Sequence, residues 1–140
     1  MVAMLALTSL SSCAGHAGSA AKAGKRADEA AARLAAEKWL KLLDSGDYEE
    51  AFEWEAKDFR LARAQPQFVR SMQARRAPFG RTLSRGLIGA VLLHKLVAAP
   101  DGDYESLIFK TAFEKKSPAA ERVILVRLPV GWRVLDYRIY

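Results

Sequence analysis

The sequence has very few of the residues that cysteine or metal chemistry requires. Cys13 is the only cysteine, and His16 and His94 are the only histidines, in 140 residues. A single cysteine excludes an internal disulfide and a cysteine-based metal cluster. The two histidines lie far apart in the chain and give no metal-binding spacing. Neither a metal nor another cofactor is therefore expected.

Other absences narrow the chemistry further. The sequence contains no glycine-rich phosphate loop and no nucleophile elbow. It has no aspartate or glutamate between Phe59 and Pro100. The apolar run at the N-terminus is too short to cross a bilayer as a helix, which takes about 20 residues. The sequence therefore indicates a fold and a cellular location more clearly than an activity.

The overall composition is that of an ordinary globular protein. Apolar residues make up 51% of the chain and charged residues 27%, close to the usual proportions. The length predicts one domain. The net charge of +6 favours anionic partners, but charge alone does not choose among nucleic acid, lipid headgroups and acidic polymers.

The first residues have the features of an export signal, which we assign to residues 1–12. Leu10-Ser11-Ser12-Cys13 resembles the bacterial lipobox, a branched apolar residue and two small residues before the cysteine that receives the lipid. The resemblance implies cleavage before Cys13, a diacylglyceryl thioether on its sulfur and acylation of the new N-terminus. The chain departs from such signals in having no Lys or Arg before the apolar run.

Ala14 at the second mature position implies sorting to the outer membrane, facing the periplasm. The alternative is cleavage after Ala17 or Ala20, which would discard Cys13 and leave a soluble periplasmic or secreted protein. Residues 13–27 are rich in Ala, Gly and Ser, which predicts a flexible tether. Its cations either lie against an anionic membrane or only keep the linker soluble; they are Lys22, Lys25 and Arg26.

Residues 28–140 are expected to form a single α+β domain. Helical spacing of apolar residues predicts helices from about Asp28 to Asp44 and from about Tyr48 to Leu61. A third helix is expected to start at Pro66, a favourable first-turn residue, and to bury apolar residues; they are Phe68, Val69 and Met72. On the first helix, the expected buried face comprises Leu34, Ala35, Trp39, Leu42 and Leu43.

Residues 39–54 predict a tight corner between the first two helices. Gly46 occupies the position where a helix ends in the left-handed conformation, which glycine adopts without penalty. Asp47 is expected to cap the next helix, with Glu50 completing a capping box.

The C-terminal half changes to the alternation typical of strands. Four strands are expected, at Leu87–Val97, Tyr104–Phe113, Val123–Leu128 and Trp132–Tyr140, with turns at Pro100-Asp101-Gly102-Asp103 and Pro129-Val130-Gly131. Helices followed by such strands predict N-terminal helices packed on an antiparallel sheet of about four strands.

An ordered set of residues is similar to one family of uncharacterised bacterial domains, numbered four thousand and nineteen. The set comprises Trp39-Leu40, Asp44, Gly46-Asp47-Tyr48, Ala51-Phe52, Ala77-Pro78-Phe79-Gly80, Asp101-Gly102-Asp103-Tyr104, Phe109, Thr111, Phe113 and Gly131-Trp132-Arg133-Val134. The arrangement also resembles the nuclear-transport-factor-two-like, or cystatin-like, fold, a cone of helices against a curved sheet. The family has no activity from which catalytic residues can be transferred.

The resemblance raises an enzymatic alternative, because some proteins of that fold are isomerases or dehydratases with a pocket inside the cone. The candidate pocket residues are His94, Asp136 and Tyr137. Each has a plainer interpretation: His94 as a hydrogen-bonded structural histidine, Asp136 as a surface residue, and Tyr137 as a core or rim aromatic.

An arginine-rich middle third is the other candidate site. Its arginines are Arg60, Arg63, Arg70, Arg75, Arg76, Arg81 and Arg85. Arginine binds phosphate and carboxylate bidentately, so the stretch predicts a surface for an anionic envelope component or another envelope protein. Export argues against nucleic acid. The alternative is a solvated face paired with acidic residues such as Glu49, Glu50, Glu53 and Asp58.

The sequence thus favours an exported, lipid-anchored envelope protein with a non-enzymatic binding or scaffolding domain. A small-molecule-binding or enzymatic domain with a pocket inside the cone is the alternative. A cone filled by aromatic side chains would favour the first, and an enclosed cavity with a buried acid or histidine would favour the second.

Overall fold

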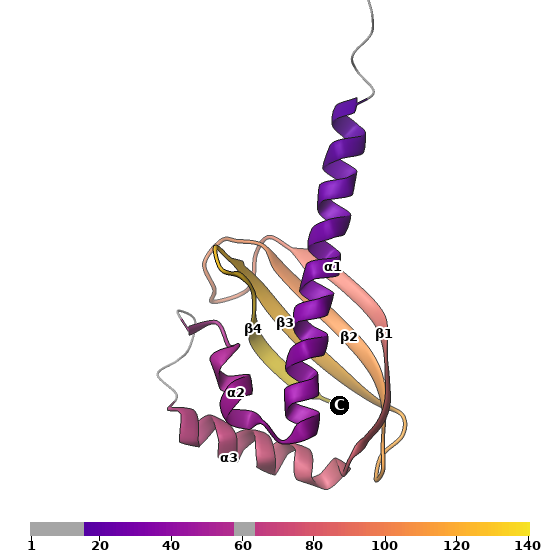
Figure 1. Ribbon diagram of the computed structural model, residues 1–140, viewed down its shortest axis with the longest axis vertical. Helices are drawn as coiled ribbons and strands as arrows, with labels where there is room; N and C mark the ends of the chain where they lie inside the picture. Colours follow the sequence, from indigo (N-terminus) through magenta and orange to yellow (C-terminus); the bar gives the residue numbers. More distant parts are fainter. Residues whose placement is uncertain (1–15, 58–63) are drawn as a thin grey trace, which may run out of the picture.

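The computed structural model describes residues 16–57 and 64–140, in which helices precede an antiparallel sheet (Figure 1). The helices are α1 (His16–Ser45), α2 (Tyr48–Glu53), α3 (Gln65–Arg76) and the short 3-10 helix η2 (Ala77–Phe79). The strands are β1 (Thr82–Leu93), β2 (Tyr104–Phe113), β3 (Ala119–Leu128) and β4 (Gly131–Ile139). The expected α+β class, with N-terminal helices on a four-stranded sheet, is confirmed.

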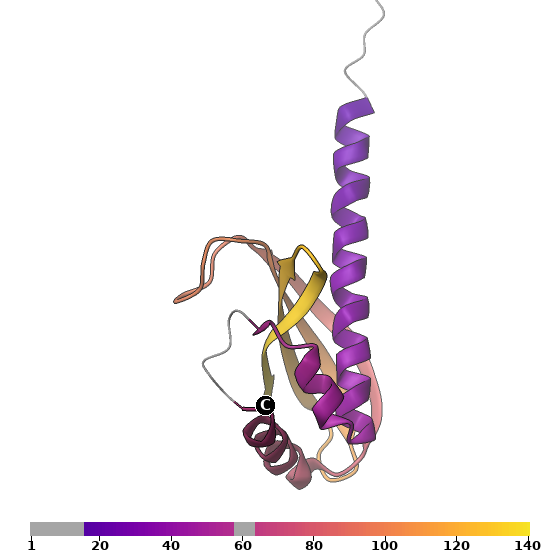
Figure 2. The same ribbon diagram turned by 60° about the vertical axis from the view of Figure 1, so that its left-hand side comes forward.

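The strands follow one another across the sheet in the order β1-β2-β3-β4, each antiparallel to the next. Along β2, alternate residues are buried, with Leu107 and Phe109 on the buried face and Lys110 exposed. This is the alternation that the sequence predicts. Register shifts interrupt the β1–β2 and β3–β4 ladders, as β-bulges do. The curved sheet wraps one side of α1, as two views show (Figures 1 and 2).

Helix α1 begins at His16, well before the expected start near Asp28. The expected flexible conformation of the tether is therefore wrong for residues 16–27, where alanine's high helix propensity prevails. Residues 18–27 are exposed, and the first turns of α1 project beyond the end of the sheet (Figure 1). Within residues 16–57 and 64–140, no helix is both long and apolar enough to span a membrane.

The corner after α1 has the expected glycine but a different cap. Gly46 has φ +82°. Its N–H donates to the Leu43 carbonyl at 3.2 Å, and the Asp47 N–H donates to the Leu42 carbonyl at 2.9 Å. This pair of bonds is a Schellman motif. The Asp47 side chain makes no capping bond, so the prediction of a capping box is wrong. The backbone of Asp47 has a ψ of 57°, which lies outside the extended region that N-cap residues normally adopt.

Helix α2 ends at Glu53, earlier than expected, because the chain then joins the edge of β4. Glu55 forms a parallel bridge with Val134. The Ala56 N–H donates to the Val134 carbonyl at 2.8 Å, and the Val134 N–H donates to the Trp54 carbonyl at 3.1 Å. The continuation to Leu61 lies partly outside the described residues.

The core fills the space between α1, α3 and the sheet. Trp39, Phe68 and Phe109 are fully buried there with Leu107 and Val123. The Trp39 indole donates to the Ala51 carbonyl at 2.9 Å, and its ring meets Tyr137 edge to face, with centroids 5.2 Å apart. Aromatic burial of this kind contributes strongly to stability.

The buried face of α1 is partly the one expected. Trp39 and Leu43 are buried, together with Leu40 and two alanines, Ala32 and Ala36. Leu34 is 54% exposed, so its assignment to this face is wrong. On α3, Pro66 lies in the first turn and Phe68 and Met72 are buried, as expected.

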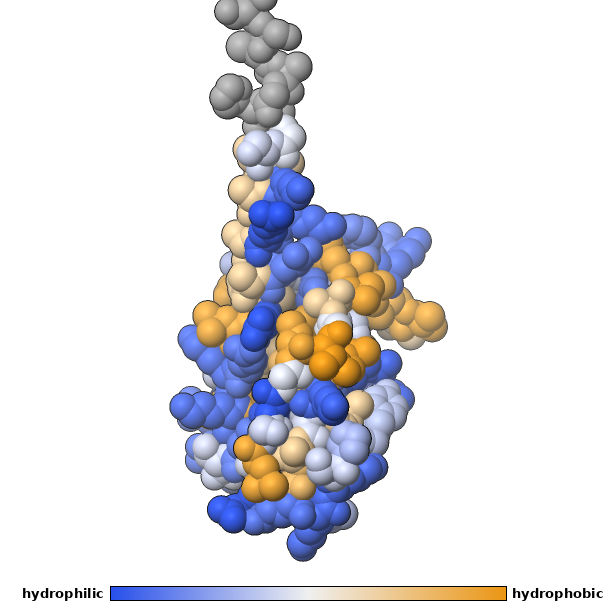
Figure 3. Space-filling model, turned by 90° about the vertical axis from the view of Figure 1, so that its right-hand side faces the viewer, coloured by the Kyte–Doolittle hydropathy of each residue, from blue (hydrophilic) through white to orange (hydrophobic). Residues whose placement is uncertain are grey.

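The strand boundaries need correction at β1 and β3. β1 starts earlier than Leu87 and ends at Leu93, and β3 starts earlier than Val123. Among the described strands, β1 has a neighbour on one side only and exposes Leu83, Ile88 and Val91. Figure 3 views the molecule from the β1 side and shows apolar patches separated by hydrophilic residues.

Candidate functional site

A buried set of charged side chains links α1, α3 and the sheet. Asp44 lies in the last turn of α1, Arg76 at the end of α3, Arg85 on β1 and Glu121 on β3. We call these four residues the ionic cluster. Because two guanidinium groups face two carboxylates, their formal charges balance.

Glu121 is the innermost member, with a side chain that is 0% exposed. One carboxylate oxygen accepts from Arg85 Nε at 2.6 Å and from the Thr111 hydroxyl at 2.6 Å. The other accepts from the Tyr137 hydroxyl at 2.5 Å and from Arg76 Nη1 at 3.2 Å. Each buried oxygen is thus satisfied twice, as a buried charge requires.

Asp44 binds the same two arginines from the solvent side. Its carboxylate accepts from Arg76 Nη2 at 2.6 Å, from Arg85 Nη1 at 2.7 Å and from the Thr82 hydroxyl at 2.7 Å. Burial alone would raise the pKa of Asp44, but the hydrogen bond and charge of Arg85, with Thr82 and Arg76, lower it below its ordinary value. Asp44 is therefore a stable anion at neutral pH.

Tyr137 serves the cluster as a fixed donor. Its hydroxyl donates to Glu121 and accepts from Arg76 Nη1 at 2.8 Å. Burial and the Glu121 carboxylate raise its pKa well above the ordinary value of a tyrosine. A general acid or base works best with a pKa near the operating pH. With its pKa raised so far, the Tyr137 hydroxyl does not suit that role.

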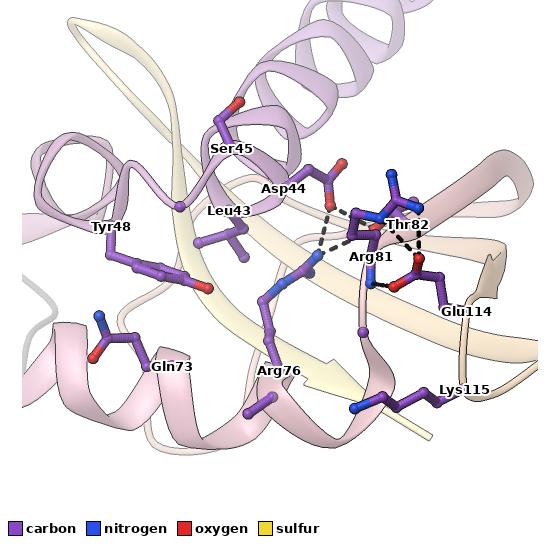
Figure 4. Close-up of a pocket in the computed structure, with 13 residues that line it drawn as sticks. Leu43, Asp44, Ser45, Tyr48, Gln73, Arg76, Arg81, Thr82, Glu114 and Lys115 are labelled. Carbon is purple, nitrogen blue, oxygen red and sulfur yellow. Dashed lines mark hydrogen bonds and ion pairs between the residues drawn. The ribbon is translucent and has the colours of Figure 1, made fainter.

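A broad groove of about 500 Å³ opens beside the cluster. Figure 4 shows Arg76 and Asp44 on one wall, Tyr48 and Gln73 on the other, and Arg81 paired with Glu114 at the rim. Arg81 Nε donates to Glu114 Oε1 at 2.8 Å, and its backbone N–H donates to Oε2 at 2.8 Å. The charges lining the groove are thus largely engaged with one another.

A smaller cavity of about 240 Å³ lies between α1 and the strands near the projecting part of the helix. Its lining contains Glu105, which is 1% exposed. Among the described residues, Glu105 Oε2 has no hydrogen-bond partner. Burial, reinforced by the Glu29 carboxylate and only partly offset by Lys25, raises the pKa of Glu105. This cavity therefore contains a buried acid with one carboxylate oxygen that accepts no hydrogen bond from the described residues.

Within the part of the chain that the structure describes, the three candidate pocket residues have separate surroundings. Tyr137 belongs to the buried contacts of Glu121. His94 is 76% exposed after β1 and its Nδ1 lies 2.8 Å from Asp103 Oδ1. Asp136 is 38% exposed and pairs with Arg138 at 3.2 Å and with Arg122 at 3.6 Å. The expectation that His94 lies within an apolar strand is wrong, because β1 ends at Leu93.

The candidate arginines divide into three groups. Arg76 is 6% exposed and Arg85 has a side chain only 13% exposed, so these two belong to the ionic cluster and not to an open surface. Arg70, Arg75 and Arg81 are exposed, although Arg75 Nη1 donates to the Tyr137 carbonyl at 2.7 Å. Arg60 and Arg63 lie outside the described residues, as does Cys13. Arg76 and Arg85 do pair with acids, but the acids are Asp44 and Glu121 and the pairs are largely buried, which differs from the solvated face that the alternative describes.

The sequence predictions include neither Glu105 nor Glu121, the two glutamates buried on strands β2 and β3. A signal for them exists in the strand alternation. Glu105 precedes Leu107 by two residues, and Glu121 precedes Val123 by two, so period-two spacing places each acid on a buried face.

Within residues 16–57 and 64–140, no group of three or more His, Asp or Glu side chains could hold a metal ion.

Comparison with known proteins identifies the family but no individual relative. Curated proteins and solved structures give no match to the chain. The model of the family described as "Protein of unknown function (DUF4019)" matches residues 35–137. This range covers the C-terminal part of α1, then α2, α3 and all but the last two residues of the sheet, and it includes every member of the ionic cluster. The chain therefore belongs to the DUF4019 family.

Proposed function

We propose that this DUF4019 protein is an exported, lipid-anchored envelope protein whose domain has a non-enzymatic binding or scaffolding role. The observation that carries the proposal is the exposed first part of α1, which begins three residues after Cys13. At about 1.5 Å per residue, residues 16–27 of this helix span about 18 Å. Such a stalk would hold the sheet clear of a membrane to which Cys13 is attached.

The charge of the stalk agrees with a membrane nearby. Lys22, Lys25 and Arg26 are exposed on its helix. Basic groups close to an anionic surface contribute roughly 1 kcal/mol each. Ala14 after the lipidated cysteine supports an outer-membrane location facing the periplasm. The soluble periplasmic or secreted form is the alternative if cleavage removes Cys13.

The interior supports a binding role more than catalysis. The acids and bases of the ionic cluster are engaged with one another. Trp39, Phe68 and Phe109 fill the space between the helices and the curved sheet. The same arrangement supports assigning the nuclear-transport-factor-two-like cone to this family.

The exposed edge of the sheet is a suitable surface for a protein partner. β1 presents a free edge among the described strands and three exposed apolar side chains, Leu83, Ile88 and Val91. Unpaired strand edges and exposed apolar residues are features of interaction sites. The remaining exposed arginines, Arg70, Arg75 and Arg81, support an anionic envelope component or another envelope protein as the partner, and not nucleic acid.

A second candidate function, small-molecule binding or enzymatic turnover within the domain, has one observation in its favour. The cavity at Glu105 contains a buried acid, which is the feature expected of a ligand pocket. This observation supports binding more directly than turnover, because the groups flanking Glu105 form no nucleophile–base pair among the described contacts.

Fractionation of the bacterial envelope tests the location. The wild-type protein should sediment with outer membranes, and Cys13→Ser should leave the membrane fraction. Ala14→Asp should move the protein to the inner membrane while leaving it membrane-bound. Recovery of wild type and Cys13→Ser in the same soluble fraction would contradict lipid anchoring.

A further inference from the structure

The cavity between α1 and the strands contains an unusual excess of negative charge. Four carboxylates line it, on Asp28, Glu29, Asp103 and Glu105, against two cationic side chains, Lys25 and Arg127. His94, Leu92 and Trp132 complete the lining. These residues come from α1, from all four strands and from the connection between β1 and β2.

The contacts within the lining are unevenly distributed. Arg127 donates to the Asp28 carboxylate, and His94 Nδ1 lies within hydrogen-bond distance of Asp103. Asp28 and Asp103 thus have partners. Glu105 is different, because it is 1% exposed and its Oε2 has no partner within the described residues. A buried acceptor without a donor costs free energy, and a ligand that supplies the donor would recover it.

The composition of the cavity selects the class of ligand. The carboxylates favour a cation, and the described residues include no cluster suited to a metal ion. Leu92 and Trp132 supply an apolar wall, and the face of an indole ring attracts organic cations. The volume of about 240 Å³ is below that of sites for drug-sized ligands. An ammonium group on a short apolar body meets all of these conditions.

We propose that this cavity is a binding site for a small organic ammonium ion, with Glu105 as its principal anionic partner. Trp132 and Leu92 contact the apolar part of the ligand, and Glu29 adds negative charge near its head group. This inference rests on the binding role proposed above but not on the lipid anchor. It assigns a ligand class to a site distinct from the ionic cluster.

Lys25 provides an internal check on the proposal. Its ammonium group lines the same cavity and lowers the pKa of Glu105, although burial and Glu29 raise it on balance. Lys25 should therefore compete with an added ammonium ion for the Glu105 carboxylate. Replacing it with the uncharged Met should strengthen ligand binding, whereas replacing Glu105 should weaken it.

Titration calorimetry on the full-length protein, purified in detergent and in amine-free phosphate buffer at pH 7, tests the proposal. The probe is phenethylammonium, with phenethyl alcohol as its neutral match and phenylacetate as its anionic match. Only the ammonium compound should bind saturably. Because a charge-assisted hydrogen bond contributes about 1.5–3 kcal/mol, Glu105→Gln should weaken binding about 10- to 100-fold. Glu37→Gln, at an exposed position of α1 outside the cavity lining, should leave it unchanged.

A stability measurement separates a ligand-binding acid from a structural one. Because the native fold raises the pKa of Glu105, ionisation of this acid disfavours folding as pH rises through and above its ordinary value. Without ligand at pH 7, Glu105→Gln should therefore keep or raise the urea midpoint of the wild type. A lowered midpoint would show that Glu105 is a structural anchor and would overturn the proposal.

Two further results would also overturn it: equal heats for the ammonium compound and the alcohol, or unchanged ammonium binding in Glu105→Gln. These outcomes leave the envelope fractionation unaffected. A protein that still sediments with membranes through Cys13 but binds no ammonium probe refutes the ligand class alone. Loss of membrane attachment with intact ammonium binding refutes the anchor alone.

Discussion

Replacing Glu121 with glutamine gives the most informative test of the ionic cluster. The substitution keeps the shape of the side chain. It removes one of the two negative charges of the ionic cluster. Arg76 and Arg85 would then share the single carboxylate of Asp44. The affected groups are buried: Glu121 is 0% exposed, Arg76 7% and Arg85 13% by side chain. Removing one partner of a buried ion pair typically costs about 3–5 kcal/mol.

Urea unfolding followed by circular dichroism measures this loss. With a denaturant slope of about 2 kcal/mol per molar, the midpoint should fall by roughly 1.5–2.5 M. Asp136→Asn is the matched control, because Asp136 pairs with Arg138 and Arg122 at an exposed position of β4. An exposed pair contributes at most about 1 kcal/mol, so the control should shift the midpoint much less.

A double substitution tests whether charge balance is the cause. Glu121→Gln combined with Arg85→Gln restores neutrality, so the double variant should lose less than the sum of the two single losses. Equal midpoints for Glu121→Gln and wild type would refute the cluster as a stabilising buried unit. Strict additivity in the double variant would refute charge balance as the reason.

Three further outcomes follow from the same structure. Trp39→Ala should lower stability by about 3–5 kcal/mol in urea unfolding, because the ring is 0% exposed and donates to Ala51; an unchanged midpoint would contradict its place in the core. Gly46→Val should also lower the midpoint, since a β-branched residue resists φ +82°, and Gly24→Val in the exposed part of α1 should lower it less. Because the folded pKa of Asp44 lies below its ordinary value, its contribution to stability is present above that ordinary value and is lost as the pH falls through the folded pKa. Asp44→Asn should therefore flatten the fall of the urea midpoint in acid, below about pH 5, and an unchanged slope would contradict the assignment.

Local patterns predict the parts of the fold that local interactions determine. The alternation around Leu107 and Phe109 locates β2, and Gly46 locates the corner. The start of α1 could not be predicted in the same way, since an Ala- and Gly-rich stretch suits both a linker and a helix. The helix face also depends on packing, since the core buries Ala32 and Ala36 and leaves Leu34 exposed.

The candidate sites depend even more on tertiary contacts. Arginine content alone predicts an open anion-binding surface, but Arg76 and Arg85 meet Asp44 and Glu121 from distant parts of the chain. His94 adjoins an apolar run, yet the strand ends one residue before it. Alternation marks Glu105 and Glu121 as acids on buried faces, but only the structure shows that Glu121 is satisfied and Glu105 is not.

The mass of the mature N-terminal peptide, isolated from the native bacterium, tests lipid anchoring most directly. The expected peptide begins at Cys13 and carries a diacylglyceryl thioether and an N-acyl chain. The same peptide should take up radiolabelled palmitate, and Cys13→Ser should abolish the labelling. An unmodified mature chain that begins after Ala17 or Ala20 would contradict the anchor and would leave the domain without attachment to the membrane.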